Sequence, residues 1–156
     1  MTKTKRKTAL IIVLCSLLAA VLIISSALFT FLNWNNFILK GFEADFEKAV
    51  QAEGFEILET KSVCGKLNGN GNGINYFSAV LIKADEDEVK ALVEALETEF
   101  EGAKYYLQED GKIATIHNEH GRLEYETALE NGKTYYTVYV FDSKIAGSNP
   151  LDPKGH

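Results

Sequence analysis

The chain has 156 residues and a formal net charge of −6, from 22 Asp and Glu against 16 Lys and Arg. All 22 acidic residues lie beyond residue 32, where the 12 Lys and Arg that remain leave a formal charge of −10. This balance argues against nucleic acid as a partner, because such binding needs a basic surface, and it gives that part of the chain no attraction to anionic lipid. A cationic partner stays open. The part beyond residue 32 is long enough for one small domain with its own core.

An apolar stretch of 24 residues runs from Ala9 to Leu32 without a charge, a Pro or a Gly. As a helix rising about 1.5 Å per residue it would be roughly 36 Å long, enough to cross a hydrocarbon core about 30 Å thick. Four Lys and Arg precede it within residues 3–7, and the next basic residue is Lys40. This asymmetry predicts a cytoplasmic N-terminus. We therefore expect residues 1–8 in the cytoplasm and residues 9–32 as a signal anchor in the bilayer of the cell membrane.

Two other interpretations of this stretch are a lipoprotein signal and a cleaved signal peptide. The first is disfavoured, because Leu14 precedes Cys15 where a small residue is required. The second stays open: cleavage near Ala27 fits the small residues around it and would release a soluble, secreted protein. The apolar run nevertheless continues through residues 28–32, and Trp34 follows where aromatic side chains anchor at the membrane interface. These features favour an uncleaved anchor.

The rest of the chain predicts one extracytoplasmic α+β domain at residues 42–142. A juxtamembrane linker is expected at 33–41 and a flexible tail at 143–156, which holds both prolines. Residues 42–53 show apolar side chains at helical spacing, and Gly54 follows as a helix-ending residue.

Two strands are expected next, at residues 55–64 and 74–83, and they would pair as a hairpin. The second contains a continuous apolar run at 79–82, which is typical of a central strand covered on both faces. Cys64 ends the first strand, either as a buried thiol or as one that could pair with another chain.

The clearest helix signal starts at Asp85, where Glu88 three places on completes a capping box. An apolar stripe follows at helical spacing and is expected to end before Gly102. The stripe comprises Val89, Leu92, Val93, Leu96 and Phe100.

From residue 103 to 141 the apolar period changes from 3.6 to 2, with turn signals at Asp110-Gly111, 118–121 and Asn131-Gly132. Counting from these turns pairs His117 with Arg122 and predicts a four-stranded antiparallel meander. One face would be apolar and packed under both helices. The opposite, polar face also carries four aromatic residues, so either a tail or partner covers it or it is a recognition surface. This candidate recognition face consists of Tyr106, Tyr135, Tyr139 and Phe141.

Two further features suggest sites. The residues of a candidate binding loop between the first two strands are Asn68, Gly69, Asn70, Gly71, Asn72 and Gly73. This loop opens a strand and lacks the Gly-Lys-Ser/Thr of a phosphate-binding loop, so its functional interpretation is recognition of a partner. His117, Glu119 and His120 could ligate a metal in a small hydrolase, but the two His are three apart and a structural turn explains them better.

The sequence therefore favours a single-pass, membrane-anchored interaction module that is not an enzyme. It names no catalytic, cofactor-binding or metal-binding residue and no cofactor, and its expected partners are the bilayer and a protein at the membrane surface. The alternatives are the metal-dependent hydrolase and the secreted protein.

Overall fold

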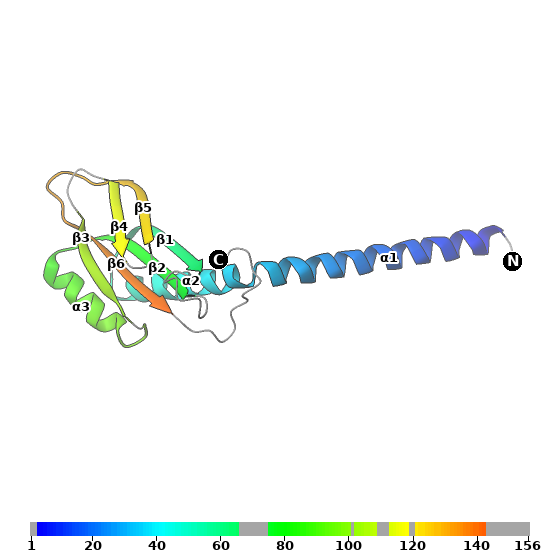
Figure 1. The fold of residues 1–156 in the computed structure, drawn as a ribbon, viewed down its shortest axis with the longest axis horizontal. Helices are drawn as coiled ribbons and strands as arrows, with labels where there is room; N and C mark the ends of the chain where they lie inside the picture. Colours follow the sequence, from blue (N-terminus) through cyan, green and yellow to red (C-terminus); the bar gives the residue numbers. More distant parts are fainter. Residues whose placement is uncertain (1–2, 66–74, 101, 109–112, 119–120, 143–156) are drawn as a thin grey trace.

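The computed structural model describes residues 3–65, 75–100, 102–108, 113–118 and 121–142, and side chains are not described for residues 3–6, 113–118 and 121–123. Figure 1 shows a long helix that stands away from an α+β domain. The elements in chain order are α1 (Lys3–Leu32), α2 (Trp34–Ala52), β1 (Ile57–Gly65), β2 (Asn75–Lys83), α3 (Glu86–Leu96), β3 (Lys104–Gln108), β4 (Ile113–Asn118), β5 (Gly121–Ala128) and β6 (Tyr135–Asp142).

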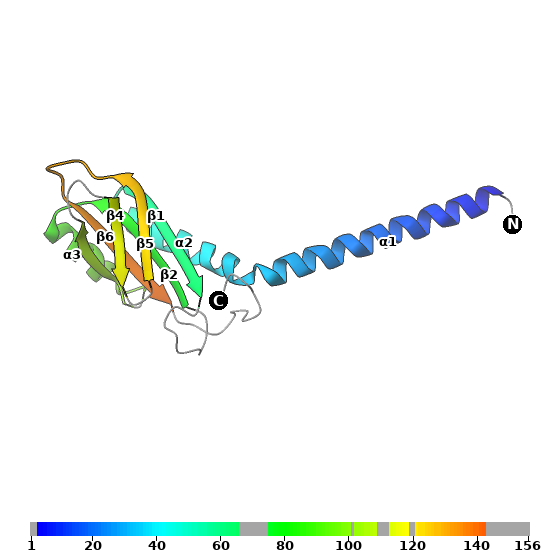
Figure 2. The same ribbon diagram turned by 45° about the horizontal axis from the view of Figure 1, so that its top comes forward.

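The domain is built on a four-stranded antiparallel sheet in the order β1-β2-β6-β3, and β4 and β5 form a separate two-stranded sheet. Helices α2 and α3 lie on one face, and β4 and β5 lie over the other (Figure 2). The predicted α+β class, the β1–β2 hairpin and the two helices packed on one face are confirmed.

The predicted four-stranded meander is wrong in its pairing. His117 does oppose Arg122 in the β4–β5 hairpin, but β3 pairs with β6, where Leu107 opposes Tyr136. Strand β6 is buried from Tyr135 to Val140, because the helices cover one of its faces and the β4–β5 layer covers the other, as is typical of a strand at the centre of a sheet. The turn signals indicate only which neighbouring strands form a hairpin. They therefore predicted the β4–β5 pairing but not the pairing of β6 with β3.

The helix-side core lies between the sheet and both helices. Its fully buried residues include Phe46 and Val50 of α2 and Leu92 of α3. Phe100, in the turn after α3, meets Phe46 edge to face with ring centroids 5.6 Å apart. The remaining buried members of this core are Val80, Ile82, Ala84, Val89, Leu96, Ala103, Tyr136, Val138 and Val140.

The hairpin-side core fills the opposite face and is richer in tyrosine. Its buried residues are Phe77, Ala79, Leu81, Tyr125, Leu129, Tyr135 and Tyr139. Tyr125 and Leu129 come from β5 and the segment after it, and the others come from β2 and β6. Strand β2 is thus buried from Asn75 to Ile82, which confirms its prediction as a central strand covered on both faces.

Both helices of the domain differ from their predicted bounds. Helix α2 begins at Trp34 rather than at residue 42, so most of the expected linker is helical. Helix α3 has the predicted capping box but ends at Leu96, because the chain turns early to place Phe100 against α2. Gly102 completes this turn with φ of +67°, and a Cβ there would lie 2.6 Å from Cζ of Phe141.

Candidate functional site

The candidate binding loop at 68–73 and the expected tail at 143–156 lie outside the described residues, so neither prediction is tested. Of the possible metal ligands, Glu119 and His120 are not described, and His117 is placed only by its backbone in β4. Within the described part of the chain, no three His, Cys, Asp or Glu side chains are grouped as metal ligands.

The face expected to be open for recognition is instead the hairpin-side core. Tyr135 and Tyr139 are only 4% and 8% exposed, while Tyr106 and Phe141 are partly buried beside them. The ring of Tyr139 packs against Tyr106 and Phe77, with centroids 5.4 and 5.5 Å apart. Strand β5 covers these rings, so the excess of aromatic area has an intramolecular explanation.

A surface groove of about 470 Å³ lies along the flank of α2 that faces the turn after α3 and the end of β6. We call it the α2 groove, and it is lined by Phe42, Asp45, Lys48, Ala49, Ala52, Glu99, Phe100 and Asp142. It brings together three segments far apart in the sequence: α2, the turn after α3 and the end of β6. A smaller hollow of about 290 Å³ adjoins it, sharing Ala49, Ala52 and Glu99 and adding Glu53.

The α2 groove has an apolar floor and an acidic rim. Phe42, Phe100 and the two alanines provide the floor, and the small alanine side chains leave the hollow. Carboxylates of Asp45, Glu99 and Asp142 line it, whereas Lys48 is its one cationic lining residue among those the structure describes. Such a surface favours an apolar segment that carries positive charge.

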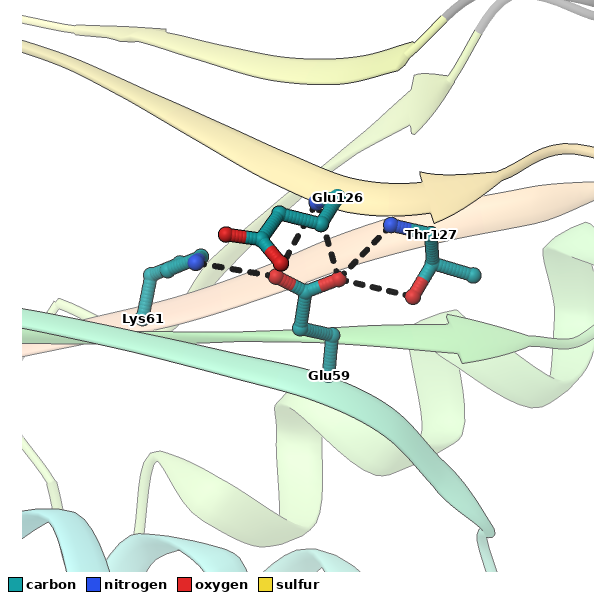
Figure 3. A network of polar contacts seen from close by, with 4 residues as sticks. All are labelled: Glu59, Lys61, Glu126 and Thr127. Carbon is teal, nitrogen blue, oxygen red and sulfur yellow. Dashed lines mark hydrogen bonds and ion pairs between the residues drawn. The ribbon is translucent and has the colours of Figure 1, made fainter.

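A polar clamp joins the hairpin-side layer to the sheet, and Glu59 is its centre (Figure 3). The Glu59 carboxylate accepts hydrogen bonds from the backbone N–H of Glu126 at 3.0 Å and of Thr127 at 2.8 Å. It also accepts one from the Thr127 hydroxyl at 2.7 Å, and Lys61 Nζ lies 3.0 Å away. One side chain of β1 therefore occupies two backbone donors of β5.

A β-bulge explains why Glu59 points toward β5. Ile57 opposes Ile82, but Glu59 opposes Leu81, so Leu58 is an extra residue in β1. Without it, residues 57 and 59 would share a face, because side chains alternate along a strand. The bulge lets Ile57 pack under the helices while Glu59 and Lys61 face the hairpin layer.

The clamp keeps Glu59 ionised over a wide pH range. Partial burial alone would raise the pKa of its carboxyl group, but the hydrogen bonds from Thr127, Glu126 and Lys61 outweigh it and lower the pKa to about 2. Neither Lys61 nor Glu59 belongs to the α2 groove, and the carboxylate already holds protein donors. We therefore assign the clamp a structural role.

The helices α1 and α2 meet at a single residue, Asn33. The Asn33 N–H donates to the carbonyl of Phe29 at 3.1 Å, and its carbonyl accepts from the Phe37 N–H at 3.1 Å. Helical hydrogen bonding thus continues across the junction. Residues 7–32 form a helix long and apolar enough to cross a membrane, and none of that segment is buried in the domain.

Comparison of the chain with protein-family models, with curated proteins and with solved structures finds no match in any of the three. The sequence missed both the clamp and the α2 groove. The available signal for the groove was the helical spacing of Phe42, Asp45 and Ala49 at i, i+3 and i+7, but the other wall of the groove comes from residues 99, 100 and 142.

Proposed function

We propose that the chain is a single-pass protein of the cell membrane, with its N-terminus in the cytoplasm and its α+β domain outside as a non-enzymatic binding module. The observation that supports it best is the apolar helix α1, which stands exposed beside a domain that closes two cores of its own. The basic residues at 3–7 support the orientation, since they precede the apolar segment on its N-terminal side.

The binding surface we propose is the α2 groove. Its apolar floor suits an apolar side chain, and its carboxylates suit a Lys or Arg beside it, so the proposed partner is a cationic segment of another protein. The domain's overall acidity would favour encounter with such a partner and disfavour nucleic acid.

Impermeant maleimide labelling of intact cells tests the orientation. In a chain carrying Cys15→Ser and Cys64→Ala, one cysteine is introduced at exposed Lys90, or at Thr4 in a second chain. The Lys90→Cys variant should label on intact cells, and the Thr4→Cys variant only after permeabilisation. Labelling in the opposite pattern contradicts the proposal, and a mature N-terminus near residue 28 in mass spectrometry would show a secreted protein.

A charge-reversal pair tests the groove. The full chain, in nanodiscs of neutral lipid, is titrated with a short Leu-Lys peptide and a Leu-Glu peptide of equal length. The Leu-Lys peptide should bind more tightly, and the double variant Asp45→Lys, Glu99→Lys should weaken it about tenfold, or about 1.4 kcal/mol. The control double variant Glu94→Lys, Glu130→Lys changes net charge equally at exposed positions outside the groove. Equal weakening by both pairs would contradict a specific site.

A further inference from the structure

The domain contacts α2 almost from its first residue. Asn35 is fully buried and accepts a hydrogen bond from the Tyr76 hydroxyl at 3.1 Å. Leu39, one turn further along α2, is buried in a cluster with Cys64 and Tyr76. The apolar segment ends at Leu32, so only two residues, Asn33 and Trp34, separate the end of the proposed membrane span from the first buried contact of the domain.

The short connection between the proposed span and the domain, which we call the Asn35–Tyr76 joint, therefore restricts their relative movement. Helical hydrogen bonds pass through Asn33, and the Asn33 side-chain amide also donates to the Phe29 carbonyl at 2.9 Å. Beyond it, the Asn35–Tyr76 hydrogen bond ties α2 to the start of β2. Figures 1 and 2 both show α2 continuing from α1 into the domain, beside the end of β1 and the start of β2.

The other side of this joint is aromatic and exposed. Phe31, Trp34 and Phe37 follow at intervals of three residues and are 48%, 43% and 48% exposed. At about 1.5 Å per residue, Trp34 lies about 3 Å and Phe37 about 7.5 Å beyond Leu32. The headgroup layer on each side of a bilayer is roughly 5–7 Å thick. Trp34 therefore falls inside this layer, where Trp is favourable, and Phe37 lies at its outer edge, within reach of the headgroups.

We propose that the first two turns of α2 form a membrane seat, in which Trp34 and Phe37 bind the lipid headgroup layer. The Asn35–Tyr76 joint then holds the domain against the bilayer with the end of β1 and the start of β2 nearest the lipid. This inference rests on the proposed membrane span, with which the seat is continuous. Lys40 is already paired with Glu43 at 2.7 Å, so the seat binds lipid through its aromatic area and tolerates salt.

Trp34 reports directly on the seat, because it is the only Trp in the sequence. The full chain is reconstituted in phosphatidylcholine vesicles, some with bromine near the headgroup end of the acyl chains and some with bromine at the chain ends. The emission should be shifted to the blue, and quenching should be stronger from the shallow bromines and unchanged in high salt. Emission like that of Trp in water, without quenching, would overturn the seat.

The variant Phe37→Ser separates a seat on α2 from the effect of the neighbouring span alone. It should shift Trp34 emission to the red and reduce shallow quenching, whereas Leu107→Ser should change neither. Leu107 is 59% exposed on β3, whose pairing with β6 places it at the far end of the domain. No change with Phe37→Ser would overturn the proposal. A blue shift with little quenching, in which quenching rises as more vesicle lipid is added per chain, would also overturn it, because it indicates that contact between copies shields Trp34. Flotation after alkaline extraction checks the span separately: its loss contradicts the proposed function itself.

Discussion

The two faces of the central sheet are covered in different ways. On the helix side, α2 and α3 contribute aliphatic and phenylalanine side chains, and burial of apolar area is sufficient to hold them. On the hairpin side, β4 and β5 share no strand ladder with the main sheet, and tyrosines fill the interface. That layer is tied by the Glu59 clamp as well as by its apolar area. Because no backbone ladder joins the β4–β5 layer to the main sheet, the hydrogen bonds of Glu59 help to fix the position of this layer.

The helix side should show the largest loss on truncation. Phe46 is fully buried and its ring contacts Phe100, so Phe46→Ala should lower the free energy of unfolding by about 3–5 kcal/mol. Denaturant unfolding of the full chain in micelles, followed by circular dichroism, measures it. Leu107→Ala, at an exposed position on β3 away from the membrane seat, serves as the control. A similar loss in both variants would contradict a helix-side core centred on Phe46.

The hairpin side should show a slightly smaller loss. Tyr139→Ser removes a ring that is 8% exposed and packed on Phe77 and Tyr106, and we expect a loss of about 2–4 kcal/mol in the same unfolding experiment. A loss below about 0.5 kcal/mol, the range of surface substitutions, would mean that the face is open to solvent.

Loss of the clamp should cost less than loss of a core ring. Glu59→Gln replaces a charged acceptor of backbone N–H groups, so we expect a loss of about 1–3 kcal/mol. Glu56→Gln, at an exposed position just before β1, is the matched control. Equal stability of the two variants would mean that the clamp does not hold the hairpin layer.

The clamp also predicts a dependence on pH. The carboxyl pKa of Glu59 is about 2 in the folded state against its ordinary value of 4.5, so the contribution of Glu59 to stability is complete above about pH 4.5. It should be lost as the pH falls from there toward 2, because protonation removes the charged acceptor. Unfolding curves at several pH values measure this loss, and it should be smaller in Glu59→Gln. Parallel pH profiles would contradict the assignment.

The smallest effect is expected at the hydroxyl of Tyr106. It is buried without a hydrogen-bond partner among the described residues, and burial raises its pKa. Tyr106→Phe should therefore change stability by less than about 0.5 kcal/mol or increase it slightly. Tyr76→Phe removes a hydroxyl that donates to Asn35 and should cost about 0.5–1.5 kcal/mol. A larger loss for Tyr106→Phe would reveal a polar partner on the hairpin side.

The helix side was predictable from the sequence because its signals are local. The capping box at Asp85, the apolar stripe of α3 and the continuous apolar run in β2 each depend on neighbours within a few residues. The position of β6 was not predictable in this way, because it depends on which of several strands pairs with both β2 and β3. Apart from Thr137, its residues from Tyr135 to Val140 are apolar or aromatic on both faces, and this signal favoured a central strand over the end of a meander.

The candidate sites depend on long-range contacts, which the sequence pattern does not contain. Glu59 meets Glu126 across 67 positions, and it does so only because Leu58 forms a bulge. The α2 groove likewise needs the turn after α3 and the end of β6 beside α2. The aromatic face was identified correctly as unusual, but whether another part of the chain covered it could not follow from local periodicity.

Native-state hydrogen exchange at the amides of Glu126 and Thr127 tests most directly whether the two layers are held differently. Both amides donate to Glu59, and β2 provides reference amides from the centre of the sheet. In Glu59→Gln, we predict that the Glu126 and Thr127 amides exchange much faster while the β2 amides change little, because the hairpin layer opens on its own. Equal acceleration of both groups, or none, would contradict a hairpin layer held by the Glu59 clamp.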